Sequence, residues 1–173
     1  IDDVAYIPEQ AYRDNLSLAS ITIGSKVKTI CAGAFYGCKN LKKVIISDGV
    51  KIIEKNAFSK CVALETIKIP ASVVRIDDRA FSDCKHLQKI ELNEGLESIG
   101  AAVFVNCGKL SDVKLPSTLT SMASDMKGGL FSGCKELETL EIPHGIKLLP
   151  HDMFRDCKKL KALKLPISIE KIG

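Results

Sequence analysis

The sequence has few of the residues from which most functional sites are built. It holds no tryptophan, 5% aromatic residues and three histidines in 173 residues. Aromatic side chains stack on bases and anchor binding interfaces, and histidine is the usual general base and a common metal ligand. The chain also lacks a Walker phosphate loop, a dinucleotide-binding fingerprint, Gly-x-Ser-x-Gly and His-Glu-x-x-His. These shortages argue against an enzyme and predict no catalytic, cofactor or metal site.

Long apolar runs and charge blocks are missing as well. No apolar run approaches the roughly 18 to 20 residues that cross a bilayer, so direct membrane insertion is not expected. The 25 basic and 21 acidic residues are mixed along the chain, which gives a net charge of +4 without a basic arm. Because nucleic-acid binders usually concentrate their positive charge, we do not expect a nucleic-acid partner. A content of 46% hydrophobic and 27% charged residues is typical of a globular domain.

The residues that are present form a repeat. All six phenylalanines are spaced 23, 23, 23, 27 and 23 residues apart, each with a cysteine three positions later and a leucine three positions after that. An apolar pair with one residue between its members follows each leucine, so the unit reads Phe-x-x-Cys-x-x-Leu-x-x-Ile-x-Ile. The phenylalanines are Phe35, Phe58, Phe81, Phe104, Phe131 and Phe154, and the cysteines are Cys38, Cys61, Cys84, Cys107, Cys134 and Cys157.

A second apolar pair closes each unit, as Val50 and Ile53 do, after a turn that contains proline or glycine. The N-terminal stretch is a weaker copy, with Tyr12 in place of phenylalanine and Asn15 in place of cysteine. The chain is therefore predicted to be a single domain, residues 1–173, of about seven units. Since neither end shows a polar capping unit, we expect it to be a fragment of a longer chain.

The spacing of apolar residues predicts a parallel β-solenoid. Residues two apart, such as Val44 and Ile46, share one face of a strand, whereas Leu41 is out of phase and must reach inward from a turn. Each unit then supplies one short strand, and the chain returns through a short strand or turn at Val50 to Ile53. Equivalent strands would stack in a parallel sheet, because a single unit cannot bury its own apolar face. We expect a β-rich fold with little helix, in which each phenylalanine covers the leucine and isoleucine of its own and the next unit.

These residues resemble the leucine-rich repeats, and within them the 23-residue BspA-like subclass. The segment Ile67-Lys68-Ile69-Pro70, followed by Val73, Ile76, Ala80-Phe81, Cys84 and Leu87, matches that pattern at every fixed position. The resemblance implies a leucine-rich-repeat solenoid that is a right-handed superhelix with one short parallel strand per 23-residue turn. It also implies a secreted or cell-surface protein, usually bacterial, that binds host or extracellular macromolecules in the manner of an adhesin.

The cysteine ladder is predicted to consist of buried free thiols. No Cys-x-x-Cys occurs, and one cysteine per unit gives a line of side chains that cannot surround a metal. The thiols would pack as small hydrophobic groups and donate weakly to the turn backbone. Cys31 lies outside this ladder, and a reactive or intermolecular role stays open for it. Four further polar residues are predicted to lie in surface loops: His86, His144, His151 and Asp152. The extra residues Ala123 to Gly129 are predicted to form a surface bulge or to add a contact.

The outward positions of the strands are the candidate partner-binding site. Lysine recurs there, with acidic residues between, and two interpretations stay open: a solvated sheet face, or a recognition surface for an acidic protein or other extracellular macromolecule. A structural spacer that presents other domains is the alternative function, and end-to-end self-association through Leu163, Leu165 and Ile169 is also expected. The candidate residues are Lys43, Ile45, Thr66, Lys68, Lys89, Glu91, Asp112, Lys114, Thr139 and Glu141.

Overall fold

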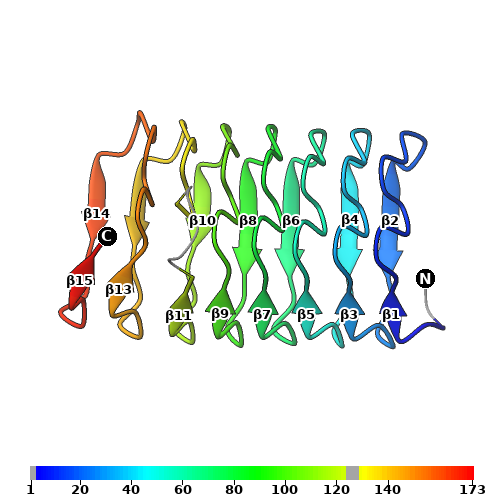
Figure 1. The fold of residues 1–173 in the computed structure, drawn as a ribbon, viewed down its shortest axis with the longest axis horizontal. Helices are drawn as coiled ribbons and strands as arrows, with labels where there is room; N and C mark the ends of the chain where they lie inside the picture. The colour runs from blue at the N-terminus through cyan, green and yellow to red at the C-terminus, as the bar shows by residue number, and fades with distance from the viewer. Residues whose placement is uncertain (1–2, 124–128) are drawn as a thin grey trace.

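The computed structural model describes residues 3–123 and 129–173, which form fifteen β-strands and no helix (Figure 1). Each repeat contributes one longer and one shorter strand. The longer strands are β2 (Ser20–Ile23), β4 (Lys43–Ile46), β6 (Thr66–Ile69), β8 (Lys89–Leu92), β10 (Asp112–Lys114), β12 (Thr139–Glu141) and β14 (Ala162–Lys164). The shorter strands are β1 (Tyr6–Ile7), β3 (Thr29–Ile30), β5 (Ile52–Ile53), β7 (Arg75–Ile76), β9 (Ser98–Ile99), β11 (Ser121–Met122), β13 (Leu148–Leu149) and β15 (Lys171–Ile172).

Strands of the same kind pair in parallel between neighbouring repeats. Thr66 lies opposite Lys89 and Ile67 opposite Ile90, an offset of one 23-residue repeat. Figure 1 shows the longer strands in one row and the shorter strands in another, with the rungs in chain order from one end to the other. The predicted parallel β-solenoid is confirmed. The segment from Val50 to Ile53, expected to be a strand or a turn, contains strand β5 at Ile52–Ile53.

The core lies between the two rows of strands. Strands β4 and β6 alternate exposed and buried side chains, as a period of two requires. Leu41 lies outside any strand, and it is fully buried as predicted. The phenylalanine rings stack on one another in a continuous column, with ring centroids 5.1 to 6.2 Å apart, and Tyr12 extends the column at 5.2 Å from Phe35. The rings thus join all seven repeats into one core.

A turn that carries the phenylalanine forms the third side of each rung. The residue two positions after the ring has a left-handed backbone in successive repeats, with φ of 71° at Gly37, 61° at Lys60, 58° at Asp83 and 60° at Asn106. Glycine, asparagine and aspartate tolerate this conformation best, which explains their recurrence at this position. The rungs are joined here by backbone hydrogen bonds such as the one from Phe58 N to the oxygen of Ala80, at 2.8 Å.

The cysteine ladder follows the same side, and its thiols are free; five of the six are buried as predicted, and Cys157 is half-buried. Each Sγ donates to the carbonyl oxygen of the aromatic residue one repeat earlier, at 3.2 Å for Cys61 to Phe35 and for Cys84 to Phe58. Asn15 fills the same position in the first repeat, but its side-chain oxygen accepts hydrogen bonds from Ser17 N and Leu18 N. The thiols thus satisfy a backbone carbonyl inside the core while adding apolar volume.

The sheet of longer strands is interrupted twice. Strands β2 and β4 pair, β6, β8 and β10 pair, and β12 and β14 pair, but no ladder joins β4 to β6 or β10 to β12. At the first break, Pro70 has no N–H at the position where Ser47 N donates to Ile23. Pro116 and Pro166 follow β10 and β14, whose ladders to β8 and β12 are intact, so proline alone does not account for the break. At the second break the repeat is longer, and most of the predicted bulge from Ala123 to Gly129 lies outside the described residues. The turn side stays joined across this repeat, since Phe104 N donates to the oxygen of Leu130 at 3.0 Å.

Candidate functional site

The ten candidate residues share one surface, which we call the strand face. It comprises the outward side chains of β4, β6, β8, β10 and β12. Nine of the ten residues are exposed, and Lys89 is half-buried. Ile45 is the most apolar of them, with 43% of its surface accessible. The structure therefore places these residues together as the strand alternation predicted, whereas their role in binding a partner stays a prediction.

Part of the charge on the strand face is in ion pairs, whereas Lys43, Lys68 and Lys114 make none among the described residues. Lys89 Nζ lies 3.1 Å from Asp112 on the next rung and 3.5 Å from Glu91 on its own strand. The hydrogen bond to Asp112 and its charge, followed by those of Glu91, raise the pKa of Lys89. Lys164 lies 3.4 Å from Glu141. Because these pairs are exposed, each contributes little to stability, but together they leave little net charge over this part of the face.

The first interruption of the sheet forms a hollow on the strand face. Between β4 and the rungs that follow it lies an open space of about 640 Å³, lined by apolar and polar side chains. Ile45 and Pro70 give it apolar walls, and Lys68, Asp48 and Asn93 bring polar groups to its rim. The Asn93 side-chain amide donates to the oxygen of Ile69 at 2.9 Å, which holds it against the neighbouring rung.

The second interruption forms a similar hollow of about 460 Å³. Lys114, Thr139 and Glu141 line it, together with His144 and Glu94 from the adjoining turns. The Glu94 carboxylate accepts hydrogen bonds from the hydroxyl and the N–H of Ser117 and from Thr118 N, at 2.9 to 3.2 Å. The Ser117 hydroxyl, then its N–H and that of Thr118, hold the pKa of Glu94 below its usual value. Glu94 is thus a fixed negative group beside this hollow.

The strand alternation did not predict the turn residues of the two hollows. Asp48, Asn93, Glu94 and His144 all lie in the turns that follow the longer strands. His144 is exposed, as predicted, but it also lines the second hollow. The proline at the end of β6 and the longer repeat after β11 were visible in the sequence, and both coincide with the missing ladders.

The other chemically active side chains do not form a site. His151 is exposed, and His86 is exposed with its Nδ1 2.7 Å from the oxygen of Val62. In the described ranges no group of three or more histidine, cysteine, aspartate and glutamate residues is placed to hold a metal ion. Cys31 is half-buried, and burial, then the charges of Glu54 and Glu9, raise its pKa. A raised pKa lowers the thiolate fraction, which disfavours the reactive role that the sequence left open.

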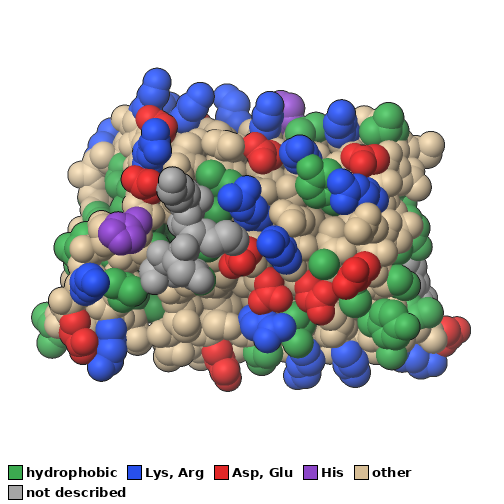
Figure 2. Space-filling view, viewed as in Figure 1, with side chains coloured by type: hydrophobic (Ala, Val, Ile, Leu, Met, Phe, Trp, Pro, Cys, Tyr) green, Lys and Arg blue, Asp and Glu red, His purple; other side chains and the backbone are tan. Residues whose placement is uncertain are grey.

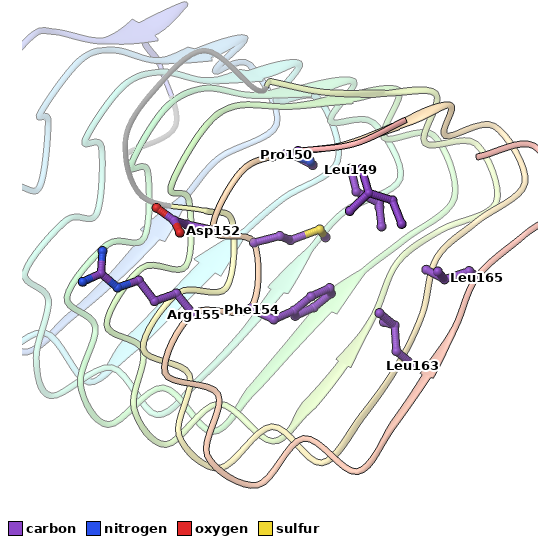
Figure 3. Close-up of a pocket in the computed structure, with 10 residues that line it drawn as sticks. Leu149, Pro150, Asp152, Phe154, Arg155, Leu163 and Leu165 are labelled. Carbon is purple, nitrogen blue, oxygen red and sulfur yellow. The ribbon is translucent and has the colours of Figure 1, made fainter. Parts of the chain in front are cut away.

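The last rungs hold a further apolar hollow, of about 460 Å³ (Figure 3). Phe154, Leu149, Leu163 and Leu165 point into it, with Asp152 and Arg155 on the outer side (Figure 3). Another repeat of a longer chain, or a second molecule, would pack against the same side chains. The expected end-to-end self-association therefore stays a prediction. None of the described residues forms a helix suited to crossing a membrane.

A solenoid with one 23-residue turn per rung and stacked parallel strands has the architecture of leucine-rich-repeat proteins. A family model described as "BspA type Leucine rich repeat region (6 copies)" matches residues 5–127 and 123–173. The chain belongs to this family, whose repeats generally act as structural or protein-interaction modules. No curated protein matches the chain.

Solved structures of bacterial proteins share the fold. A leucine-rich repeat protein from T. pallidum is 32% identical, with a TM-score of 0.84 over 90% of this chain and 73% of that one. One from Bacteroides ovatus is 32% identical, with a TM-score of 0.89 over 99% of this chain and 43% of that one. The pneumococcal vaccine antigen PcpA is 25% identical, with a TM-score of 0.62 over 96% of this chain and 57% of that one. The chain thus spans less than half of the Bacteroides protein.

Proposed function

We propose that this chain is an adhesin-like binding module that docks host or extracellular proteins across the strand face and has no catalytic role. The observation that carries the proposal is the pair of hollows at the sheet interruptions, which five of the ten candidate residues line. Those five are Ile45, Lys68, Lys114, Thr139 and Glu141. A sheet face with recesses gives a partner places to bury side chains, which a flat solvated face lacks.

The rigidity of the rungs supports this role. Neighbouring rungs are joined by the ring column and by backbone hydrogen bonds, so the backbone positions that carry the outward side chains are fixed relative to one another. A pre-ordered surface loses little conformational entropy when it binds. The family and the likeness to a vaccine antigen also support a location on a cell surface or outside the cell.

The test uses two sets of three substitutions on opposite rows of strands. The first set is Ile45→Ser, Lys68→Ser and Lys114→Ser on the strand face. The matched control is Tyr6→Ser, Lys28→Ser and Lys51→Ser, which also removes one exposed apolar side chain and two lysines, here on or beside the shorter strands. Both proteins are compared with the parent chain on an array of immobilised extracellular-matrix and host-surface proteins.

We expect the first set to weaken binding to the captured protein by about tenfold or more, because it removes apolar burial and two charge contacts. The control should bind like the parent chain. Loss of binding in the control alone would place the site on the other row of strands. If the parent chain binds no protein on the array, the spacer function becomes the better interpretation.

A further inference from the structure

A second surface, separate from the strand face, carries a row of lysines with few acidic residues. It lies along the turns between each ladder cysteine and the following leucine, just before each longer strand. We call the first two residues after each ladder cysteine, or after Asn15, the basic edge. It carries Lys39, Lys85, Lys109, Lys135, Lys158 and Lys159, with His86 and a single acid, Glu136.

The charge of this edge exceeds that of the whole molecule. Six lysines and one glutamate give the basic edge a formal charge of +5, against +4 for the entire chain. Figure 2 shows these side chains as a row along the upper border of the molecule, where the turns above the longer strands lie in Figure 1. The rest of the chain is therefore close to neutral, and the edge concentrates a positive potential in a line.

Five of the six lysines of the basic edge make no ion pair with a described residue. Only Lys159 is paired, with Glu136 at 2.7 Å. Within residues 3–123 and 129–173, Lys39, Lys85, Lys109, Lys135 and Lys158 are exposed and make no ion pair or side-chain hydrogen bond. Their charges are thus available to a ligand without first breaking an internal contact.

The spacing of the lysines follows the rungs. Lys85, Lys109, Lys135 and Lys158 come from four successive repeats, and the ring column of those repeats advances by 5.4 to 6.2 Å per rung. Gly108 stands where the repeats on either side have Lys85 and Lys135, which leaves a recess of about 410 Å³ between these two lysines. Asn106 and Asp83 line the same recess, and the Asn106 amide donates to Asp83 at 3.0 Å. Two lysines against one aspartate leave the recess positive.

The positive row is narrow, which limits the shape of the partner that can bind to it. One flank of the lysine row is formed by the residue that precedes each ladder cysteine or Asn15. This residue is acidic in three repeats, at Asp14, Asp83 and Asp156, and basic in one, at Lys60. A broad acidic surface would meet these carboxylates as well as the lysines. A narrow polymer with one negative charge per monomer can follow the basic edge without meeting these aspartates.

We propose that the basic edge binds a linear acidic polysaccharide, with successive sulfate or carboxylate groups held by the lysines of successive rungs. An extended chain of six-membered sugar rings advances by about one ring per rung, and its hydroxyl groups can bond to Asn40 Oδ1 and His86 Nε2 on the same edge. The Asn40 amide nitrogen and His86 Nδ1 are already bonded to the oxygens of Leu16 and Val62.

Nucleic acid fits this edge less well. Single strands are held by stacking on exposed aromatic rings as well as by lysines. Tyr36 already has the Arg13 guanidinium 4.5 Å and the Lys60 ammonium 5.1 Å from its ring centroid. Among the described residues the large exposed aromatic side chain is Tyr6, on β1 in the other row of strands. The edge therefore offers charge without a base-stacking surface.

The test measures binding of the chain to heparin oligosaccharides of defined length, as a sulfated probe, and to polygalacturonate, as a carboxylated one. The variant Lys85→Gln, Lys109→Gln and Lys135→Gln removes the centre of the row. The control variant, Lys28→Gln, Lys51→Gln and Lys55→Gln, makes the same change in net charge at exposed lysines away from the basic edge and from the strand face. Thermal unfolding of both variants checks that the solenoid is intact.

We expect at least one probe to bind, more weakly as salt rises, and the edge variant to lose about tenfold in affinity while the control loses about twofold or less. The better of the two probes identifies the anionic group. Equal losses in the two variants, or no binding to either probe at low salt, would overturn the proposal. Tighter binding of single-stranded DNA of equal charge would overturn it in favour of nucleic acid. Protein binding at the strand face is untouched by any of these outcomes.

Discussion

Replacement of Phe81 by alanine tests the ring column most directly. Its ring is fully buried and lies between Phe58, at 5.4 Å, and Phe104, at 6.1 Å. Removing a buried phenylalanine costs about 3 to 5 kcal/mol through lost transfer free energy and the cavity that remains. Each lost aromatic pair adds about 0.5 to 1.5 kcal/mol, so the change should lie toward the upper end of that range.

The position in the array sets a second expectation. Phe154 is half-buried and has one ring neighbour in the described structure, Phe131 at 6.2 Å. In a repeat protein the stability is close to a sum of repeat and interface contributions, so a central rung loses two interfaces and a terminal rung loses one. Phe154→Ala should therefore destabilise the chain by roughly half as much as Phe81→Ala.

The assay is thermal unfolding followed by circular dichroism, with urea unfolding as a check. For a chain of this length, 1 kcal/mol corresponds to about 2 to 4 °C, so Phe81→Ala should lower the midpoint by about 6 to 20 °C. Lys51→Ala, at an exposed position, serves as the control. A midpoint for Phe81→Ala as high as that of Lys51→Ala would refute the view that the stacked rings hold the rungs together.

Two further predictions concern the thiols and an acidic group. In denatured protein without reductant, a thiol reagent should titrate all seven cysteines. In native protein the five buried ladder thiols should react far more slowly than half-buried Cys31 and Cys157. Recovery of only one free thiol from the denatured protein would mean three disulfides. Ser117→Ala should raise the lowered pKa of Glu94 toward its ordinary value, measured by NMR titration, with Ser121→Ala as control. A carboxyl group with a lowered pKa stabilises the fold at pH above its ordinary pKa, and this stabilisation is lost as the pH falls through the lowered pKa. Ser117→Ala should therefore also make the stability less sensitive to acid. An unchanged pKa of Glu94 would contradict a role of the Ser117 hydroxyl in lowering it.

The sequence by itself was enough to predict the rung. The recurrence of phenylalanine, cysteine and leucine at constant offsets predicted equivalent positions in every turn. These residues are buried as expected from Phe35 to Leu137 and half-buried in the last repeat. The reason is local: a strand has a side-chain period of two, so Val44 and Ile46 point inward whenever Ile45 points outward. For the same reason the exposed members of the strand face could be identified from the alternation alone.

The departures at the N-terminal repeat show the limit of that reasoning. Asn15 stands in place of a ladder cysteine and, like the cysteines, makes side-chain hydrogen bonds to the backbone. Its oxygen accepts from Ser17 N and Leu18 N, however, whereas a cysteine such as Cys61 donates to the rung before it. The sequence indicated a polar role, but the direction of the bond depends on which backbone groups the turn presents.

Only the tertiary structure decided how the rungs are joined and which charges remain free. The pairing of Lys89 with Asp112 requires two residues 23 positions apart to face each other on adjacent strands. The missing ladders beside β6 and β12, and the hollows there, depend on the separation of whole rungs. A repeat pattern predicts the conformation of each rung because the apolar spacing and the turn residues that determine it lie within one unit. Ion pairing, hollows and the unpaired line of lysines arise between units, where small displacements of one rung against the next determine which groups meet.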